Sequence, residues 1–366
     1  MKKSLLWITI LVVIISLLAV FSLGGCKPTA AVETTAAAET TVAPETTAAT
    51  ETTAAAEATT AEPEKVFTIL FMPGVADPFY FTMEKGIQKK VAELGGSVKL
   101  IVAEYPKSWG PEAQVPILEA VTAQGGIDLI LIAPTSTDAL IAPLKKLYDQ
   151  GIAIITVDTY LGDGDYSKDS DYSFPLSYIG TDNKLGGEKI AENLAKMMDS
   201  KGKVYLMNTN PDTSSVVDRG NGFAEGIAKF PEMSLVGTDW CMDIQEKAQE
   251  LATAALQKNP DIAGIFGVNL FSSQGSYQAV VNAGLTGAVK IASWDATQDL
   301  INALKEGKVD MVLAQKPAEI GFLGVEWGYK YLKDNAEVPK KVIPGFEFFT
   351  KDNVDNPDMA QFIYSK

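Results

Sequence analysis

The sequence predicts an α/β protein with two lobes, each built on a doubly wound parallel sheet. From Lys65 onward, short apolar runs alternate with amphipathic helical patterns, which is typical of parallel α/β folds. The runs are nearly continuous in Val, Ile and Leu, as strands covered on both faces should be. A loop-like stretch at 160–178 interrupts the series, so we expect one lobe before it and a second lobe after it.

The apolar runs define the expected strands, and the polar spacing between them defines helices. The expected strands are 66–71, 98–103, 129–133, 153–158, 203–208, 264–269, 290–295 and 311–315. Two stripes have the spacing of a helix that packs on a core. They are Leu140, Leu144, Leu147 and Tyr148, and then Leu300, Ile301 and Leu304.

The N-terminus has the layout of a secretory signal, with a basic start, a long apolar run and small residues. An uncleaved anchor helix is the alternative, because the apolar run is just long enough to span a bilayer. The ending Leu23-Gly24-Gly25-Cys26 resembles the bacterial lipoprotein signal, in which the cysteine is lipidated and becomes the mature N-terminus. We therefore expect residues 1–26 to be a lipoprotein signal peptide. The remainder should be extracytoplasmic and lipid-anchored to the cell membrane through Cys26.

Residues 27–64 consist almost entirely of Ala, Thr, Glu and Pro, and Glu recurs at 33, 39, 45, 51 and 57. Six residues turn about 240° on a helix, so these charges would not share one face. No apolar side chain larger than Val is present to offset the entropy of ordering. The segment is expected to be a disordered tether.

Composition narrows the possible chemistry. The formal charge of −15 argues against a nucleic-acid partner. The chain has no histidine and two cysteines, Cys26 and Cys241, so neither a disulfide framework nor a zinc site is expected. We expect no metal and no cofactor. The acidic run 163–171 is interpreted as a solvated loop, because it lacks the full twelve-residue spacing of a calcium-binding loop. Calcium binding by its carboxylates is the alternative.

Polar residues follow several expected strands. Ligands bind beyond the carboxyl ends of strands in open parallel sheets, so these residues are candidate ligand contacts. They are Asp158, Asn269, Trp294, Asp295 and Gln315, together with Asp77 after the first strand and Thr181 and Asp182 after 178. Each residue could instead cap the next helix. That alternative suits Asp182 best and suits Asp158, Asn269 and Gln315 less, because no helix clearly begins after them.

Carboxylates beside aromatic residues suggest a polyol ligand. Sugar hydroxyls need carboxylates, amides and Arg as hydrogen-bond partners, and sugar C–H faces need flat rings. Asp77 lies beside Phe79, Tyr80 and Phe81. We expect Phe79 and Tyr80 to reach the ligand and Phe81 to lie in the core. Trp109 is expected either at the rim of the site or on the surface.

From Lys65 onward the chain resembles type I periplasmic sugar-binding proteins, the ribose-, xylose- and galactose-binding group that serves ABC importers. Four segments carry the resemblance, and their order and spacing are more specific than any one of them. They are "DPFYFTMEKGIQKKVAELG", "LIAPTSTDALIAPLKKLYDQGIAIITVDT", "YIGTDNKLGGEKIAENL" and "DRGNGFAEGI".

The resemblance implies a set of sugar contacts. They are Asp77, Phe79, Tyr80, Asp158, Arg219, Trp240, Asn269, Trp294, Asp295 and Gln315. Thr181 and Asp182 complete the expected contacts as strand-end candidates. Asp158 and Arg219 should contribute most to affinity, unless they form a structural salt bridge with each other. Asp77 stands where the family usually has Asn, Ala133 stands where ribose binders carry Asn, and Thr159 stands where they carry Arg. Ribose itself is therefore not the expected ligand.

The resemblance also implies two lobes joined by three crossovers, with the ligand cleft between them. The N-terminal lobe would comprise 65–180 and 315–343, and the C-terminal lobe 181–314 and 344–366. We expect a monomeric binding protein, not an enzyme, that passes a monosaccharide or related polyol to an ABC transporter permease. The alternatives are a sugar sensor for signalling or chemotaxis, a binder of a non-sugar ligand such as a nucleoside, and a glycosidase.

Overall fold

The computed structural model describes residues 65–365, which belong to one compact unit, Ala61–Lys366. The expected signal peptide 1–26, its lipidated Cys26 and the expected tether 27–64 lie outside the described residues. No helix in the described part of the chain is both long enough and apolar enough to cross a bilayer.

The first sheet is entirely parallel. Its strands are β1 (Phe67–Met72), β2 (Val98–Val102), β3 (Leu129–Ile132), β4 (Ala153–Val157), β5 (Ser177–Ile179) and β11 (Lys341–Val342). Their order is β11-β5-β4-β3-β1-β2. β3 and β4 are buried along their whole length, as expected for strands covered on both faces. The first four expected strands are confirmed to within one residue at each end.

The second sheet is parallel except at one edge. Its strands are β6 (Lys201–Asn208), β7 (Glu232–Trp240), β8 (Ile262–Gly267), β9 (Lys290–Trp294), β10 (Met311–Gln315) and β12 (Phe346–Thr350). The order is β12-β10-β9-β8-β6-β7, and β12 runs antiparallel to β10. The expected strands in this lobe are confirmed to within two residues.

Strands β5, β7, β11 and β12 are absent from the sequence-based prediction, because none of them is a long, uniformly apolar run. β5 has three residues and β11 has two. β7 and β12 lie at opposite edges of the second sheet, where polar residues interrupt the apolar ones. Edge strands are covered less completely than central strands, so the apolar signal is weak there.

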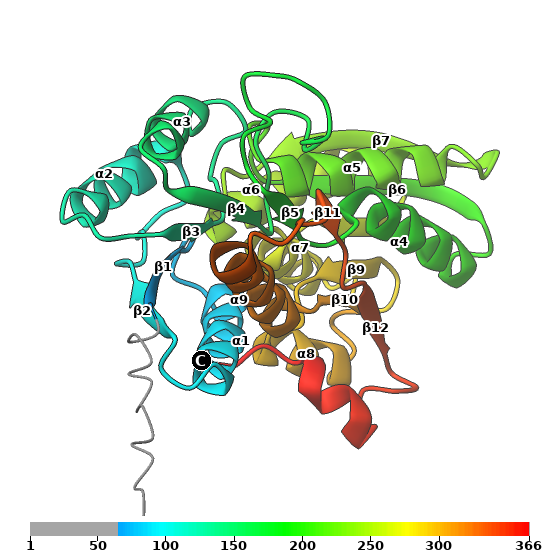
Figure 1. Cartoon of the computed structure of the whole chain (residues 1–366). Coiled ribbons are helices and arrows are strands. Elements are labelled where there is room, and N and C mark those ends of the chain that lie inside the picture. Colours follow the sequence, from blue (N-terminus) through cyan, green and yellow to red (C-terminus); the bar gives the residue numbers. More distant parts are fainter. Residues whose placement is uncertain (1–64, 366) are drawn as a thin grey trace, which may run out of the picture. The chain divides into compact units, whose positions relative to one another are not determined.

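Helices cover both faces of each sheet (Figure 1). In the first lobe they are α1 (Pro78–Glu93), α2 (Pro111–Thr122), α3 (Ile141–Asp149) and α9 (Pro317–Asp334). In the second lobe they are α4 (Asn183–Met197), α5 (Ser214–Ile227), α6 (Gln245–Lys258), α7 (Leu270–Asn282) and α8 (Gln298–Lys305).

Alternate residues of the central strands pack against opposite helix layers. Leu129 and Leu131 of β3 share a core cluster with the α1 and α9 side, whereas Ile130 shares one with the α2 and α3 side. The expected stripe in α3 is buried at Leu140, Leu144 and Leu147. Its last member is wrong, because Tyr148 is 40% exposed at the end of the helix. The stripe in α8 is buried at all three positions.

The chain passes between the two lobes three times. It leaves the first sheet after β5 and enters α4, returns after β10 into α9, and crosses once more between β11 and β12. Each lobe is therefore discontinuous in sequence. This arrangement, two α/β lobes with parallel sheets and three crossovers, confirms the predicted fold class.

Candidate ligand-binding site

A pocket lies between the lobes, and its lining residues follow the carboxyl ends of strands in both sheets. This is where parallel sheets generally bind ligands. Eight of the predicted contacts line the pocket. They are Asp77, Phe79, Tyr80, Asp158, Arg219, Asn269, Asp295 and Gln315.

Asp158 directly follows β4 and is 5% exposed. Its backbone adopts a left-handed φ of 63°, which is uncommon for a residue other than glycine. The hydroxyl of Tyr80 donates to Oδ2 at 2.8 Å, and the hydroxyl of Tyr178 donates to the backbone oxygen of Asp158 at 3.0 Å. Burial raises the pKa of Asp158 to about 6, although nearby Arg219 and the bond from Tyr80 oppose the rise.

Asp77 has a structural role as well as a place in the pocket. It is the N-cap of α1, and Oδ1 accepts from the backbone N–H of Tyr80 at 3.1 Å. Pro78 at the first helical position completes the start of the helix. Burial raises the pKa of Asp77 well above its usual range, and repulsion from Asp295 and Asp243 adds to the rise. The capped helix end therefore carries an aspartate whose charged form is disfavoured.

The aromatic wall is built from Phe79, Tyr80 and Trp109. The rings of Phe79 and Tyr80 meet edge to face at 5.0 Å, and Trp109 stacks on Tyr80 with centroids 6.3 Å apart. Gly74 allows this approach, because a Cβ there would lie 2.4 Å from the Trp109 ring. The expectation for Phe81 is wrong, since Phe81 is only half-buried, against Tyr105, whereas Phe79 and Tyr80 are buried.

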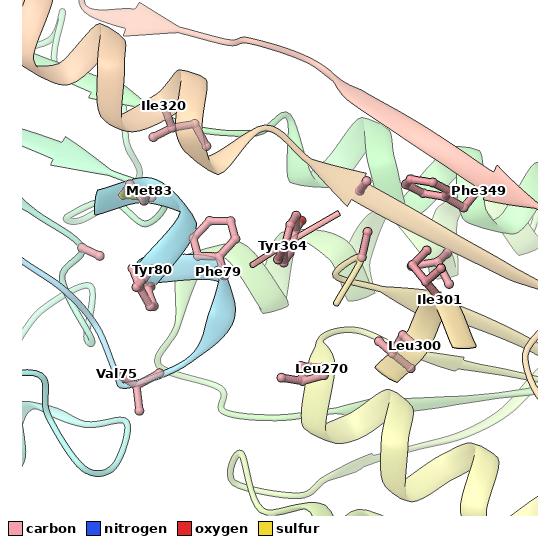
Figure 2. Packing of buried hydrophobic residues seen from close by; sticks show 14 of the residues in the cluster. Val75, Phe79, Tyr80, Met83, Leu270, Leu300, Ile301, Ile320, Phe349 and Tyr364 are labelled. Atoms are coloured by element: carbon pink, nitrogen blue, oxygen red, sulfur yellow. The ribbon is translucent and has the colours of Figure 1, made fainter. Parts of the chain in front are cut away.

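Phe79 also links this wall to the C-terminus. Its ring packs edge to face on Tyr364 at 5.7 Å (Figure 2). The Tyr364 hydroxyl accepts from the backbone N–H of Gln315 at 2.8 Å. It donates to the carboxylate of Asp295 at 3.5 Å and has no closer acceptor among residues 65–365. The C-terminal segment thus supports one side of the pocket.

Arg219 of α5 is 3% exposed and is held from three sides. Nε donates to Asn183 at 2.9 Å, Nη1 donates to the carbonyl of Val268 at 3.0 Å, and the guanidinium lies 4.2 Å from the centre of the Trp294 ring. Within residues 65–365, Nη2 has no hydrogen-bond partner and Arg219 forms no salt bridge. Arg219 and Asp158 therefore do not form a direct salt bridge, and the guanidinium keeps donors for a ligand.

Three polar side chains at the ends of β8, β9 and β10 form hydrogen bonds with neighbouring groups. Asp295, with φ 75°, accepts from the backbone of Leu270 at 3.2 Å and from Nε2 of Gln315 at 3.0 Å. Asn269 caps α7 and also donates from Nδ2 to Asp243 at 2.6 Å. The expectation that no helix begins after Asn269 is wrong, because α7 starts at Leu270.

Four predicted contacts do not line the pocket. The Thr181 hydroxyl donates to Oε1 of Gln315 at 2.7 Å, and Asp182 caps α4. Trp294 is fully buried beneath Arg219, so it supports the guanidinium from behind. Trp240 is half-buried at the end of the edge strand β7.

The pocket also contains residues that the prediction missed. They are Val75, Thr209, Thr213, Ser215, Val216 and Asp243. Trp109, expected either at the rim or on the surface, lines the pocket. Asp243 follows β7, and the same strand-end rule would have found it if β7 had been recognised.

The lobes touch each other beside the pocket. Nε1 of Trp109 donates to Thr213 at 2.8 Å, and the Tyr160 hydroxyl donates to Asp218 at 2.8 Å. The backbone N–H of Tyr160 also donates to Ser214 at 3.1 Å. These contacts between loops of the first lobe and α5 describe a closed arrangement.

Among residues 65–365 no cluster of three or more acidic or cysteine side chains is suited to a metal ion.

Comparisons with known proteins agree with this geometry. A family model described as a periplasmic binding protein domain matches residues 68–336. A D-ribose/D-allose-binding protein of Pseudomonas aeruginosa is 28% identical over 272 residues, which is 74% of this chain and 83% of that protein.

Solved structures are similar over most of both chains. An ABC transporter solute-binding protein from Agrobacterium vitis, bound with α-D-tagatopyranose, is 42% identical with a TM-score of 0.79 and covers 82% of this chain and 100% of its own. A second solute-binding protein from the same organism, with bound D-fucose, is 25% identical with a TM-score of 0.74 and covers 81% and 100%.

Proposed function

The chain belongs to the periplasmic binding protein family, and from this premise we propose that it captures a monosaccharide or related polyol between its lobes and delivers it to an ABC transporter permease. The family resemblance inferred from the sequence is thereby confirmed. Membership also means that the folded part acts outside the cytoplasm. The protein binds and releases its ligand as a monomer and without catalysis.

The observation that carries this proposal is the pairing of hydrogen-bonding groups with an aromatic wall in one pocket. Asp158 and Arg219 offer an acceptor and a donor from opposite lobes, both almost completely buried. Phe79 and Tyr80 offer ring surface beside them. A sugar presents both hydroxyls and apolar C–H faces, so one ligand can satisfy both kinds of surface.

The similarity to the tagatose-bound structure suggests where to begin. That protein is 42% identical to this chain, compared with 25% for the D-fucose-bound protein. A neutral ketohexose in its ring form is therefore the first candidate. Pentoses, aldohexoses and acyclic polyols follow, because the curated and solved relatives are associated with several of these classes.

A thermal-shift screen of the purified protein against neutral sugars and polyols, with nucleosides included, tests the proposal. A ligand at a hundred times its Kd should stabilise the folded state by ~2.7 kcal/mol. We expect a clear rise in Tm with one or a few sugars. A rise with nucleosides alone would contradict a sugar ligand, and turnover of an aryl glycoside would contradict a purely binding role.

We further propose that Cys26 carries a lipid that anchors the protein to the membrane. The proposal is supported by the small residues that precede this cysteine and by the apolar run before them. Mass spectrometry of the membrane fraction should detect a mature chain that begins at an acylated Cys26. An unmodified chain that begins at Met1 would contradict it.

A further inference from the structure

The pocket holds an unusual balance of charge. Four carboxylates line it, from Asp77, Asp158, Asp243 and Asp295, against the single guanidinium of Arg219. A ligand that enters this space meets many more acceptors than donors. The acceptor oxygens that have no donor within the protein should therefore determine which ligand binds.

Most donors of the lining are already used within the protein. Tyr80 donates to Asp158, Asn269 to Asp243 and Gln315 to Asp295. The carboxylate of Asp77 accepts one bond, from the backbone of Tyr80, and the carboxylate of Asp243 accepts one, from Asn269, each at Oδ1. No residue of 65–365 donates to Oδ2 of either Asp77 or Asp243. These two oxygens come from opposite lobes and remain free for hydrogen bonds from a ligand.

Asp243 is held firmly in its position. It follows Cys241, whose backbone N–H donates to Asn208 at 3.0 Å, and Met242, whose N–H donates to Thr209 at 2.8 Å. Both Met242 and Asp243 have left-handed φ values, 55° and 60°. The turn thus directs the carboxylate to the pocket from a fixed backbone. The buried Arg219, with Nη2 open, lies in the same pocket and marks it as a ligand site.

We propose that Asp243 is a specificity-determining residue that, together with Asp77, accepts hydrogen bonds from hydroxyls of a neutral sugar and excludes acidic sugars such as uronates and sugar phosphates. The inference rests on the proposed sugar-binding function and adds the ligand's charge class. An anionic group placed here would meet the negative charge of Asp243, and it would add to the repulsion that already disfavours the charge of Asp77.

Binding should be linked to protons. Burial raises the pKa of Asp243 to about 6, the bond from Asn269 opposes the rise, and Asp295 adds to it. The other charged groups of the pocket are Asp77, Asp158 and Arg219. Sugar hydroxyls that donate to a carboxylate favour its charged form. Binding therefore lowers the pKa values of the contacted aspartates and releases protons. Affinity should therefore increase as the pH rises from 5.0 to 7.5.

The test compares wild type with Asp243→Asn by calorimetric titration of D-tagatose, or of the neutral sugar with the largest thermal shift, at pH 5.0 and 7.5. One group with a pKa of about 6 that must ionise weakens binding about tenfold over this interval. Asp158 and Asp243 together can weaken wild-type binding up to about a hundredfold. Asp243→Asn should bind less tightly at pH 7.5, lose about a factor of ten of the pH dependence, and release fewer protons in paired buffers.

The matched control is Asp239→Asn, which changes an aspartate of β7 that accepts from Tyr205 at 2.6 Å and does not line the pocket. It should keep the wild-type affinity and pH dependence. An unchanged pH dependence in Asp243→Asn would overturn the proposal while leaving sugar binding intact. If no neutral sugar binds wild type at either pH, the proposed function fails and this inference fails with it.

A second measurement uses wild type alone, so it does not depend on how the variant folds. D-galacturonate carries a carboxylate on a sugar ring and should bind at least about a hundredfold more weakly than the best neutral sugar, since opposed like charges cost several kcal/mol. Binding within tenfold of the neutral sugar would overturn the proposed exclusion.

Discussion

At the scale of single residues, the bond between Tyr80 and Asp158 controls when the central carboxylate is charged. Burial raises the pKa of Asp158 to about 6, and the bond that the Tyr80 hydroxyl donates at 2.8 Å limits this rise. Tyr80→Phe keeps the ring and removes this donor. The pKa of Asp158 should then rise further, and the pH at which sugar affinity is half-maximal should move upward.

Calorimetric titration of the protein with sugar at several pH values measures this shift in the pH dependence of affinity. We expect affinity at pH 6 to fall severalfold in Tyr80→Phe and to recover in part at pH 8, because deprotonation is then complete again. Tyr205→Phe is the control, since Tyr205 also donates to an aspartate, at 2.6 Å to Asp239, but does not line the pocket. A pH profile that coincides with wild type would show that Tyr80 does not tune Asp158.

The charged form of Asp158 should lower the free energy of unfolding of the protein when no sugar is added. Its pKa is raised in the folded state to about 6, so its contribution to stability is present at low pH and is lost as the pH rises through 6. Asp158→Asn removes this loss. At pH 7.5 the unliganded variant should melt at or above the wild-type temperature, and its free energy of unfolding should be higher by up to about 3 kcal/mol. A clearly lower Tm would assign Asp158 a structural role.

Arg219 illustrates how far sequence reasoning reaches at this scale. Its place in the pocket agrees with the family pattern, but its three supporting contacts could not be predicted from that pattern. Asn183, Val268 and Trp294 lie far from Arg219 in sequence and meet it only because α4, α5 and β9 pack together. For the same reason Trp294 was expected in the pocket, whereas it lies behind the guanidinium.

At the scale of elements, α4 and α5 pack so closely that one face has no room for a side chain. A Cβ at Gly222 would lie 1.9 Å from the carbonyl oxygen of Lys184. Gly222→Ala should push α5 away from α4 and destabilise the second lobe by about 1–3 kcal/mol or more. Because Arg219 lies one turn earlier on α5, sugar affinity should fall as well.

Thermal melting and sugar titration of the same sample check this prediction. Gly237→Ala is the matched control, since a Cβ there would meet only the Tyr205 ring, at 3.5 Å. It should change the Tm little. Equal Tm values for the two variants would contradict the close helix contact.

Buried central strands could be predicted from the sequence, whereas edge strands could not. β3 and β4 are uniformly apolar and fully buried, so their pattern alone located them. β7 mixes exposed and half-buried residues at an edge, so it was missed, and Asp243 was missed with it. Most site residues that the sequence identified lie at the ends of strands that it recognised or in α1, whereas Arg219 of α5 was identified from the family pattern. Those it overlooked follow β1, β6 and β7 or come from α5 and its preceding loop.

At the scale of the whole described molecule, contacts between the lobes hold the pocket closed. Tyr160 donates to Asp218 of α5 at 2.8 Å, and neither residue lines the pocket. Tyr160→Phe removes this bond and leaves the ligand contacts in place. The closed state should become less populated, so affinity should fall by severalfold, mainly through faster release of sugar.

Stopped-flow measurement of sugar release checks this prediction. Tyr205→Phe again provides the control, because its bond lies within the second lobe. An unchanged release rate in Tyr160→Phe would mean that this contact does not contribute to closure. Such a result would not contradict the proposed sugar contacts, since lobe closure and sugar binding depend on different residues.

The central claim is that a neutral sugar binds between the lobes through Asp158. Calorimetric titration of wild type and Asp158→Asn with the best sugar of the screen tests it most directly. We predict one sugar per chain for wild type and a roughly hundredfold loss in the variant, since hydrogen bonds to a charged group contribute about 1.5–3 kcal/mol each. Equal affinity in the two proteins, or no binding of any neutral sugar by wild type, would contradict the account.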